Sequence, residues 1–443
     1  MEKAEQGKQD SSQKLNLFGL CVFGIGIIIG AGVYAILGIA ASQSGTTLAL
    51  SFLMAAVVAL LTGLSYCELG TLFPKAAAEY YYLKTAYPKK EWMSFALAAL
   101  LILAGCATSA AVAMAFGGYI QEFVKIPEFL CALILMVIVT AINLLGIQGS
   151  SRANIILTFI EILGLVIVVW FGMTTQMPVK EVSFDIHAGT FSAAALIFFV
   201  YLGFEDIVNL AEDTNKPDKN IPRAIIISLI VTSFLYIAVA IAVMRMTTPE
   251  ILSTSKTPLA AAISKTAPKW IGVLNSIALI SMANTVLITM LAVGRMVFGV
   301  AKDAQLPAMF AKTSQKKAIP FNAILLTLGV SGLFLFLSGL DELANVASLC
   351  ALWGFLVVNW LVIVLRYKKR ELKRSFRVPL NIGEFPVLSA LGCLTCIALL
   401  TQFKLKIHLI ILGVMILILG IQLLISKKKS NNSHLECSIA DEN

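Results

Sequence analysis

Runs of about 20 apolar residues recur along this chain between short polar or Pro/Gly-rich segments, and their length constrains the fold more than any other feature. The mean hydropathy is +0.88, and only 13% of the 443 residues are charged, far fewer than in a soluble domain. The sequence therefore predicts an all-α integral membrane protein with twelve transmembrane helices. We place them near residues 17–42, 46–73, 92–122, 127–147, 153–175, 190–211, 223–245, 270–300, 319–340, 343–366, 384–402 and 406–426.

The basic residues predict the orientation of these helices, because cytoplasmic segments retain Lys and Arg. With both termini inside, the runs YKKRELKR at 367–374 and KKK at 427–429 lie on the cytoplasmic side. We expect cytoplasmic tails at 1–14 and 427–443, and a multi-pass protein of the plasma membrane, which in a prokaryote is the inner membrane. The net charge of +9 follows from this topology and gives no support to nucleic-acid binding.

Two of the predicted helices contain a flexible interruption near the middle. The first contains GIIIGAG at 26–32, and the sixth contains YLGFED at 201–206. Discontinuous helices at corresponding positions of two halves are typical of transporters built from inverted repeats, with the binding site at the membrane midplane. Five helices per repeat place the first repeat at 15–175 and the second at 190–366, followed by two additional helices at 384–426.

A helix that is interrupted inside a membrane exposes backbone amides and carbonyls that need polar partners. Amides at the start of a half-helix suit a carboxylate and free carbonyls suit an ammonium group, so the two breaks together suit a free amino acid. Close helix packing is the alternative for the first break, because Gly26 and Gly30 have the spacing of small residues at membrane-helix contacts. The counterpart in the sixth helix favours a binding site.

Five sequence stretches stand out by their order and spacing. They are GIGIIIGAGVYAILG at 24–38, LSYCELGTLFPKAAAEYYYL at 64–83, FFVYLGFEDIVNLAEDTNKPDKNIPRAI at 198–225, NTVLITMLAVGRMVFGVAKDAQLP at 284–307 and FRVPL at 376–380. Together they resemble the amino acid–polyamine–organocation superfamily of permeases. The resemblance implies a LeuT-like core of five plus five helices in which helices 1 and 6 are broken. The chain departs from the family pattern at Ala31, where a hydroxyl residue is common, and at Lys216 and Ala304.

The resemblance also assigns residues of the two breaks to the substrate. The implied set is Ile28, Gly30, Ala31, Gly32, Phe199, Val200, Leu202 and Phe204. The backbone amides of residues 30–32 would hold the substrate carboxylate. Its ammonium group would be held by the backbone carbonyls of Ile28, Phe199, Val200 and Leu202. Phe204 stands where the family often has an aromatic gate over the substrate, and simple packing is the alternative role.

Glu161 is the only charged residue in the apolar run 153–175. A carboxylate at mid-membrane costs about 2.5–3.5 kcal/mol on insertion scales, so it is a functional candidate by default. Burial favours the neutral form of the group, which suits a proton carrier. By resemblance, Glu161 occupies a position where several relatives carry a lysine in place of a bound sodium ion. Proton coupling, cation binding with carbonyls of the first helix, and a static buried hydrogen bond all remain open.

Further candidates for coupling or gating are Glu205, Asp206, Ser281, Asn284 and Thr285. By resemblance, Glu205 takes part in proton-linked gating or exchange in some relatives. Glu205 and Asp206 would otherwise pair with a cationic substrate side chain or accept hydrogen bonds from loop amides. The other three share one face of the eighth helix and would supply oxygens beside the fifth helix, unless they only bond carbonyls of their own helix.

These features predict a secondary active transporter of amino acids that works by alternating access, with proton coupling through Glu161 or Glu205. The alternatives are an amino acid or polyamine exchanger, and a sensor that binds an amino acid without translocating it. An enzyme is disfavoured, because no span carries a paired acid and base. We expect no cofactor and no metal site. The expected partners are a free amino acid, a coupling ion that is a proton or Na+, and membrane lipid. The amino acid carried, the energy source and the oligomeric state stay open.

Overall fold

The computed structural model describes residues 14–74, 77–145, 151–175, 185–211, 214–303, 305–313, 319–337 and 339–440, and only the backbone at 151–154, 337 and 424–440. The elements up to the middle of the chain are α2 (Leu17–Ile29), α3 (Gly32–Ser44), η1 (Gly45–Thr47), α4 (Leu48–Leu72), α5 (Ala78–Ala86), α6 (Glu91–Ile120), α7 (Glu128–Leu145), α8 (Ser151–Thr174), α9 (Ala188–Ile197), η2 (Phe198–Tyr201) and η3 (Phe204–Leu210). The remaining elements are α10 (Pro217–Met246), α11 (Pro249–Thr254), α12 (Pro258–Ile263), η4 (Pro268–Trp270), α13 (Ile271–Lys302), η5 (Ala308–Ala311), α14 (Phe321–Leu337), α15 (Leu340–Lys368), β1 (Asn381–Ile382), β2 (Phe385–Pro386), α16 (Val387–Leu400) and α17 (Leu405–Ala440).

The predicted helical architecture is confirmed, apart from one small hairpin in which β1 pairs antiparallel with β2. Among the described residues, nine helical segments are long and apolar enough to cross a membrane. One of them, Gly32–Leu72, runs through α3, η1 and α4. Three shorter apolar helices cover Leu17–Ile29, Phe321–Phe336 and Val387–Leu400. The count of twelve spans and the inverted repeat stay predictions.

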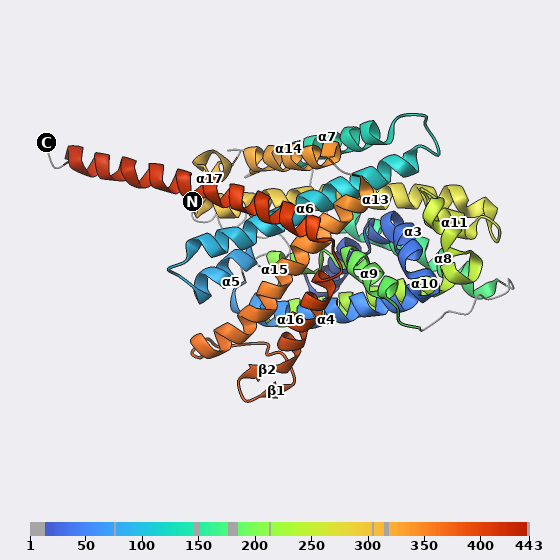
Figure 1. Ribbon diagram of the computed structural model, residues 1–443, viewed down its shortest axis with the longest axis horizontal. Coiled ribbons are helices and arrows are strands. Elements are labelled where there is room, and N and C mark those ends of the chain that lie inside the picture. Colours follow the sequence, from blue (N-terminus) through green and yellow to red (C-terminus); the bar gives the residue numbers. More distant parts are fainter. Residues whose placement is uncertain are drawn as a thin grey trace, which may run out of the picture.

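Most of the long helices lie roughly along one direction, whereas α15 crosses them obliquely (Figure 1). In that view α7 and α14 lie side by side along the upper edge, and α3 and α9 lie together near the middle. The short helices α5 and α11 lie towards opposite ends of the bundle. The last helix, α17, projects from the bundle and continues to Ala440, well beyond the expected end at residue 426.

Three short helices lie in segments that the sequence analysis treated as connections: α5, α11 and α12. Both α11 and α12 start with a proline, which suits the first position of a helix because its missing N–H would have no partner there. The helix α5 matters most, since it packs on α6 and on α15 and places a buried carboxylate beside the central helices. A pattern of long apolar runs does not predict this helix, because α5 spans only Ala78–Ala86.

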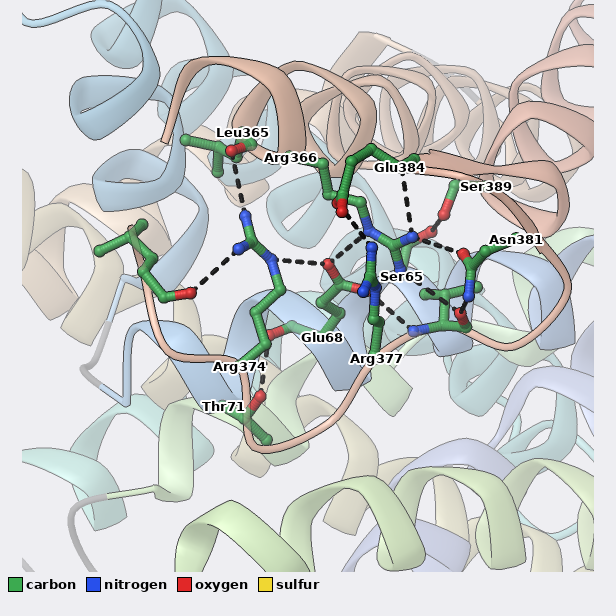
Figure 2. Close-up of polar contacts among 12 residues, drawn as sticks. Ser65, Glu68, Thr71, Leu365, Arg366, Arg374, Arg377, Asn381, Glu384 and Ser389 are labelled. Atoms are coloured by element: carbon green, nitrogen blue, oxygen red, sulfur yellow. Dashed lines mark hydrogen bonds and ion pairs between the residues drawn. The ribbon is translucent and has the colours of Figure 1, made fainter. Parts of the chain in front are cut away.

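A buried ion-pair network joins α4, α15 and the segment before α16 (Figure 2). Glu68 of α4 accepts two hydrogen bonds from Arg366 of α15, at 2.9 Å from Nε and 2.5 Å from Nη2. Its carboxylate also accepts from Arg374 Nε at 3.2 Å and from the amide of Val378 at 2.8 Å. Arg366 and Glu68 are 0% and 1% exposed. Because four donors meet one carboxylate, the charge is compensated without water.

Breaking this network should destabilise the protein far more than breaking an exposed ion pair. Arg366→Met leaves Glu68 buried with fewer positive partners, and such a change costs about 3–5 kcal/mol. The matched control is Arg377→Met, which removes an ion pair to Glu384 whose two side chains are each 44% exposed and which is worth less than about 1 kcal/mol. Thermal unfolding of the purified variants in detergent measures the difference. Equal melting temperatures for the two variants would contradict the structural role of Glu68 and Arg366.

Candidate functional site

The first break lies between α2 and α3, at Gly30 and Ala31. The helix α2 ends at Ile29, Gly30 adopts φ +21°, and α3 begins at Gly32. A Cβ atom built on Gly32 would lie only 2.9 Å from Cα of Val200 in η2, so the two breaks meet backbone to backbone here. Only glycine allows this approach without a shift of one helix against the other. Gly26 fits the packing interpretation instead, because its Cβ would lie 2.1 Å from Oγ1 of Thr158 in α8.

The second break follows α9 and is longer. The chain tightens into the 3₁₀ turn η2, becomes extended at Leu202, and reverses at Gly203, whose φ of +113° is a conformation that residues with side chains rarely adopt. The carboxylate of Glu205 accepts a hydrogen bond from the amide of Gly203 at 2.8 Å. Glu205 therefore stabilises the turn with one of its oxygens, which matches the loop-amide role left open by the sequence.

A cavity lies where the two breaks meet, and most of the substrate residues predicted from the sequence line it. These lining residues are Ile28, Gly30, Ala31, Gly32, Phe199, Val200 and Leu202. Glu205, Asp206 and Thr285, predicted for coupling or gating, line the same cavity. Four predicted residues lie outside its wall: Phe204, Glu161, Ser281 and Asn284. Backbone groups and small side chains therefore dominate the wall near α3.

The amides predicted to bind a carboxylate differ in their availability. The Gly30 amide donates to the carbonyl of Gly26 at 3.0 Å, and the Ala31 amide donates to Thr285 Oγ1 of α13 at 3.0 Å. The Gly32 amide belongs to the first turn of α3, where a helix leaves its N–H groups without intrahelical acceptors. Of the three predicted amides, Gly32 is the one placed by the helix itself to receive an anion.

The carbonyls at the two breaks are bridged by Tyr236 of α10. Its hydroxyl lies 2.6 Å from the carbonyl oxygen of Ile28 and 3.3 Å from that of Val200, and donates to this pair. The side chain is fully buried. Tyr236 was not among the predicted site residues, although it is the one tyrosine of α10 and a buried phenol needs a hydrogen-bond partner. Tyr236 thus occupies two of the four carbonyls that the family resemblance assigned to an ammonium group.

Glu161 lies in α8, fully buried behind the first break rather than in the cavity wall. Its Oε1 accepts from Nδ2 of Asn284 at 3.3 Å, and its Oε2 has no hydrogen-bond partner in the described part of the chain. Ser281, one turn before Asn284 on α13, donates to the carbonyl of Gly30 at 2.7 Å. The predicted face of α13 therefore reaches both Glu161 and the backbone of the first break.

Phe204 lies among aromatic side chains away from the cavity. Its ring centroid is 5.6 Å from that of Tyr66 and 5.3 Å from that of Phe355, and its side chain is fully buried. The structure therefore favours packing over a gate for this residue. The family position alone gave no side-chain direction, and a 3₁₀ helix places side chains differently from an α-helix.

Glu79 is a cavity residue that the sequence analysis did not select. It lies in α5, is 1% exposed, and lines the cavity together with Thr108 of α6 and Thr289 of α13. The only sequence signal was a single carboxylate between three alanines and three tyrosines in the connection after α4. A carboxylate at the edge of a short connecting helix is usually solvated, so the signal was easy to pass over.

Comparisons with known proteins identify the family of this chain. The family model described as "Amino acid permease" matches residues 15–421. The chain is 29% identical over 419 residues to the "Branched-chain amino acid permease BcaP" of Bacillus subtilis, covering 88% of this chain and 89% of that protein. It is 29% identical over 418 residues to the "Methylthioribose transporter" of Bacillus subtilis, with the same two shares.

A third relative, "Cationic amino acid transporter 4, vacuolar" of Arabidopsis thaliana, is 26% identical over 387 residues, which cover 82% of this chain and 64% of that protein. The names of these three relatives state different substrates, but each name describes a permease or transporter. Since the family model covers nearly the whole apolar part of the sequence, this chain belongs to the amino acid permease family and is a multi-pass membrane transporter, not an enzyme.

Proposed function

We propose that this permease carries a free amino acid across the membrane by alternating access. Twelve spans would result if α2 and α3 form one broken span, α9 to η3 another, and α14 and α16 cross the membrane as well. Residues 15–175 and 190–366 would then be two inverted repeats, and α16 and α17 would follow them. The observation that carries the proposal is a cavity lined by residues of both helix breaks.

The site would recognise the groups that all amino acids share. The first turn of α3 offers the Gly32 amide and the positive end of a helix dipole to the carboxylate. The carbonyls of Ile28 and Val200 would receive the ammonium group when the Tyr236 hydroxyl gives way to it. Rocking of one helix bundle against the other would then expose this pair of contacts to each side of the membrane in turn.

Protons are the proposed energy source, with Glu161 as the coupling residue. Its carboxyl group is fully buried, and one of its oxygens has no partner among the described residues, so a proton there costs no existing hydrogen bond. Asn284, which donates to Glu161, lies one turn from Ser281, which holds the Gly30 carbonyl. A change of charge at Glu161 would therefore alter the hydrogen bonding of the first break through α13. Sodium coupling, exchange, and binding without translocation are the competing functions.

The proposed location is the plasma membrane, with both termini in the cytoplasm. The basic segment that contains Arg366, Arg374 and Arg377 would then face the cytoplasm, as the distribution of Lys and Arg favours. Cysteine labelling of residues engineered at Lys369 and at Lys265, which lie on opposite sides in this topology, would test it in intact cells.

Gly32→Pro should abolish transport, because proline removes the amide proposed to hold the carboxylate. Gly32→Ala is the matched variant: it keeps the amide but adds the Cβ that lies 2.9 Å from Val200 Cα. We expect reduced uptake for the alanine variant and none for the proline variant, measured as accumulation of labelled amino acid in liposomes. Gly420→Ala, whose Cβ meets nothing within 4 Å, should behave as wild type. Equal uptake by the proline and alanine variants would count against a role of the amide.

Glu161→Gln should remove uptake driven by a pH gradient while it leaves counterflow of internal against external amino acid, since glutamine keeps the Asn284 contact but carries no proton. The measurement compares proteoliposomes with and without an inward proton gradient. Glu371→Gln, on a side chain that is 67% exposed, serves as control. If wild-type uptake needs only internal amino acid and ignores the gradient, the protein is an exchanger. Saturable binding without any counterflow would instead identify a sensor.

A further inference from the structure

Glu79 is a buried carboxylate without a positively charged partner in the described part of the chain. It projects from α5 into the cavity wall, and neither of its side-chain oxygens has a hydrogen-bond partner in the described part of the chain. The helix that carries it is fixed, because Tyr80 and Lys84 both donate to Asp303 at the end of α13. The orphaned oxygens therefore belong to a held side chain, and burying such a group without a partner is costly.

Two other carboxylates line the same cavity. Glu205 accepts from the Gly203 amide, and Asp206 accepts from Nδ2 of Asn209 at 3.4 Å. None of the ion pairs among the described residues involves Glu79, Glu205 or Asp206. The hydrogen bonds that Glu205 and Asp206 accept in the described part of the chain come from neutral donors, so a positive charge brought by a ligand would favour ionisation of more than one member of this acidic group.

The contrast with Glu68 shows what is missing at Glu79. Glu68 is equally buried, and two arginines and an amide compensate its charge. At Glu79 the surrounding polar groups are the buried hydroxyls of Tyr66 and Tyr82, which are neutral and so do not compensate a negative charge as the arginines do at Glu68. The carboxylate oxygens on the cavity wall accept hydrogen bonds, so a ligand group with several N–H donors would suit them.

We propose that Glu79, together with Glu205 and Asp206, forms a subsite for a cationic group at the end of the substrate side chain, an ammonium or a guanidinium. The inference rests on the proposed function, because the rest of the substrate would occupy the two helix breaks in the same cavity. A guanidinium carries five N–H donors in one plane and an ammonium carries three, so either group can satisfy several of the orphaned acceptors at once. The permease would then select cationic over neutral amino acids of equal size.

The test compares L-arginine with L-citrulline, which has nearly the same shape but no charge. Dissociation constants of both ligands are measured on the full-length protein in detergent, for wild type and for Glu79→Gln. We expect wild type to bind arginine at least tenfold more tightly than citrulline, and the variant to lose most of this ratio while its affinity for citrulline is unchanged. Glu371→Gln, far more exposed, should keep the wild-type ratio.

Asp206→Asn provides a second variant in case glutamine at position 79 disturbs α5, and it should lower the ratio as well. A wild type that binds both ligands equally, or variants that keep the arginine preference, would overturn the subsite while leaving amino acid transport intact. Failure of both ligands and of all other amino acids to bind would overturn the proposed function itself. The two failures are therefore distinguishable.

The pH dependence offers a readout that a merely structural glutamate would not change. Burial, with the nearby charge of Asp206, raises the pKa of Glu79 to about 7. Tyr66 of α4, Tyr82 of α5, and Glu205 and Asp206 of η3 face this group. Because Glu79 is ionised only above its pKa while the guanidinium stays charged throughout, arginine affinity should rise between pH 6 and pH 8. Glu79→Gln should weaken that rise, and citrulline affinity should change little; an unchanged arginine profile in the variant would contradict the subsite.

Discussion

A membrane interior offers no water to an open backbone, and that constraint organises the centre of this protein. Each helix break frees amides and carbonyls, and side chains from other helices take them up. Thr285 accepts from the Ala31 amide, Ser281 donates to the Gly30 carbonyl, and Tyr236 bridges Ile28 and Val200. The breaks are stable because α13 and α10 supply the missing partners. A substrate that displaces such a partner exchanges one hydrogen bond for another, which keeps binding reversible.

The same arrangement explains the departure at Ala31. A hydroxyl at this position, common in the family that the sequence resembles, would be a partner inside the first break. Here Thr285 brings a hydroxyl to the same amide from α13. In this chain the hydroxyl belongs to the neighbouring helix and not to the broken one, so α13 takes a direct part in the conformation of the break. Sequence comparison at one position cannot show such an exchange, because the two residues are 254 positions apart.

The sequence predicted those features that depend on local chemistry. Clustered glycines indicated the first break and the YLGFED stretch at 201–206 indicated the second, and Gly30 and Gly203 adopt backbone conformations that residues with side chains rarely adopt. The lone charge of Glu161 indicated a buried site, and its partner Asn284 was predicted on the correct face of α13. The sequence could not predict the direction in which a side chain points or the contacts between distant helices. The side chain of Phe204 points into an aromatic cluster, and Tyr236 of α10 contacts both breaks. The position of Glu79 in the cavity wall follows from the short helix α5, which is too short and too polar to stand out as an apolar run.

The buried carboxylates of this permease differ in what surrounds them, and the differences indicate separate roles. Glu68 is saturated by arginines and joins α4 to α15, so it belongs to the rigid part of the molecule. Glu161 has one neutral partner and lies behind the first break, where, in the proposed mechanism, gain or loss of a proton would act on α13 and through it on the backbone of Gly30. Glu79 has no partner among the described residues and faces the cavity, where a ligand can reach it. The roles proposed for these three carboxylates thus follow the number of donors that each already has, because a charge can respond to a proton or a ligand only where the protein has left it incompletely compensated.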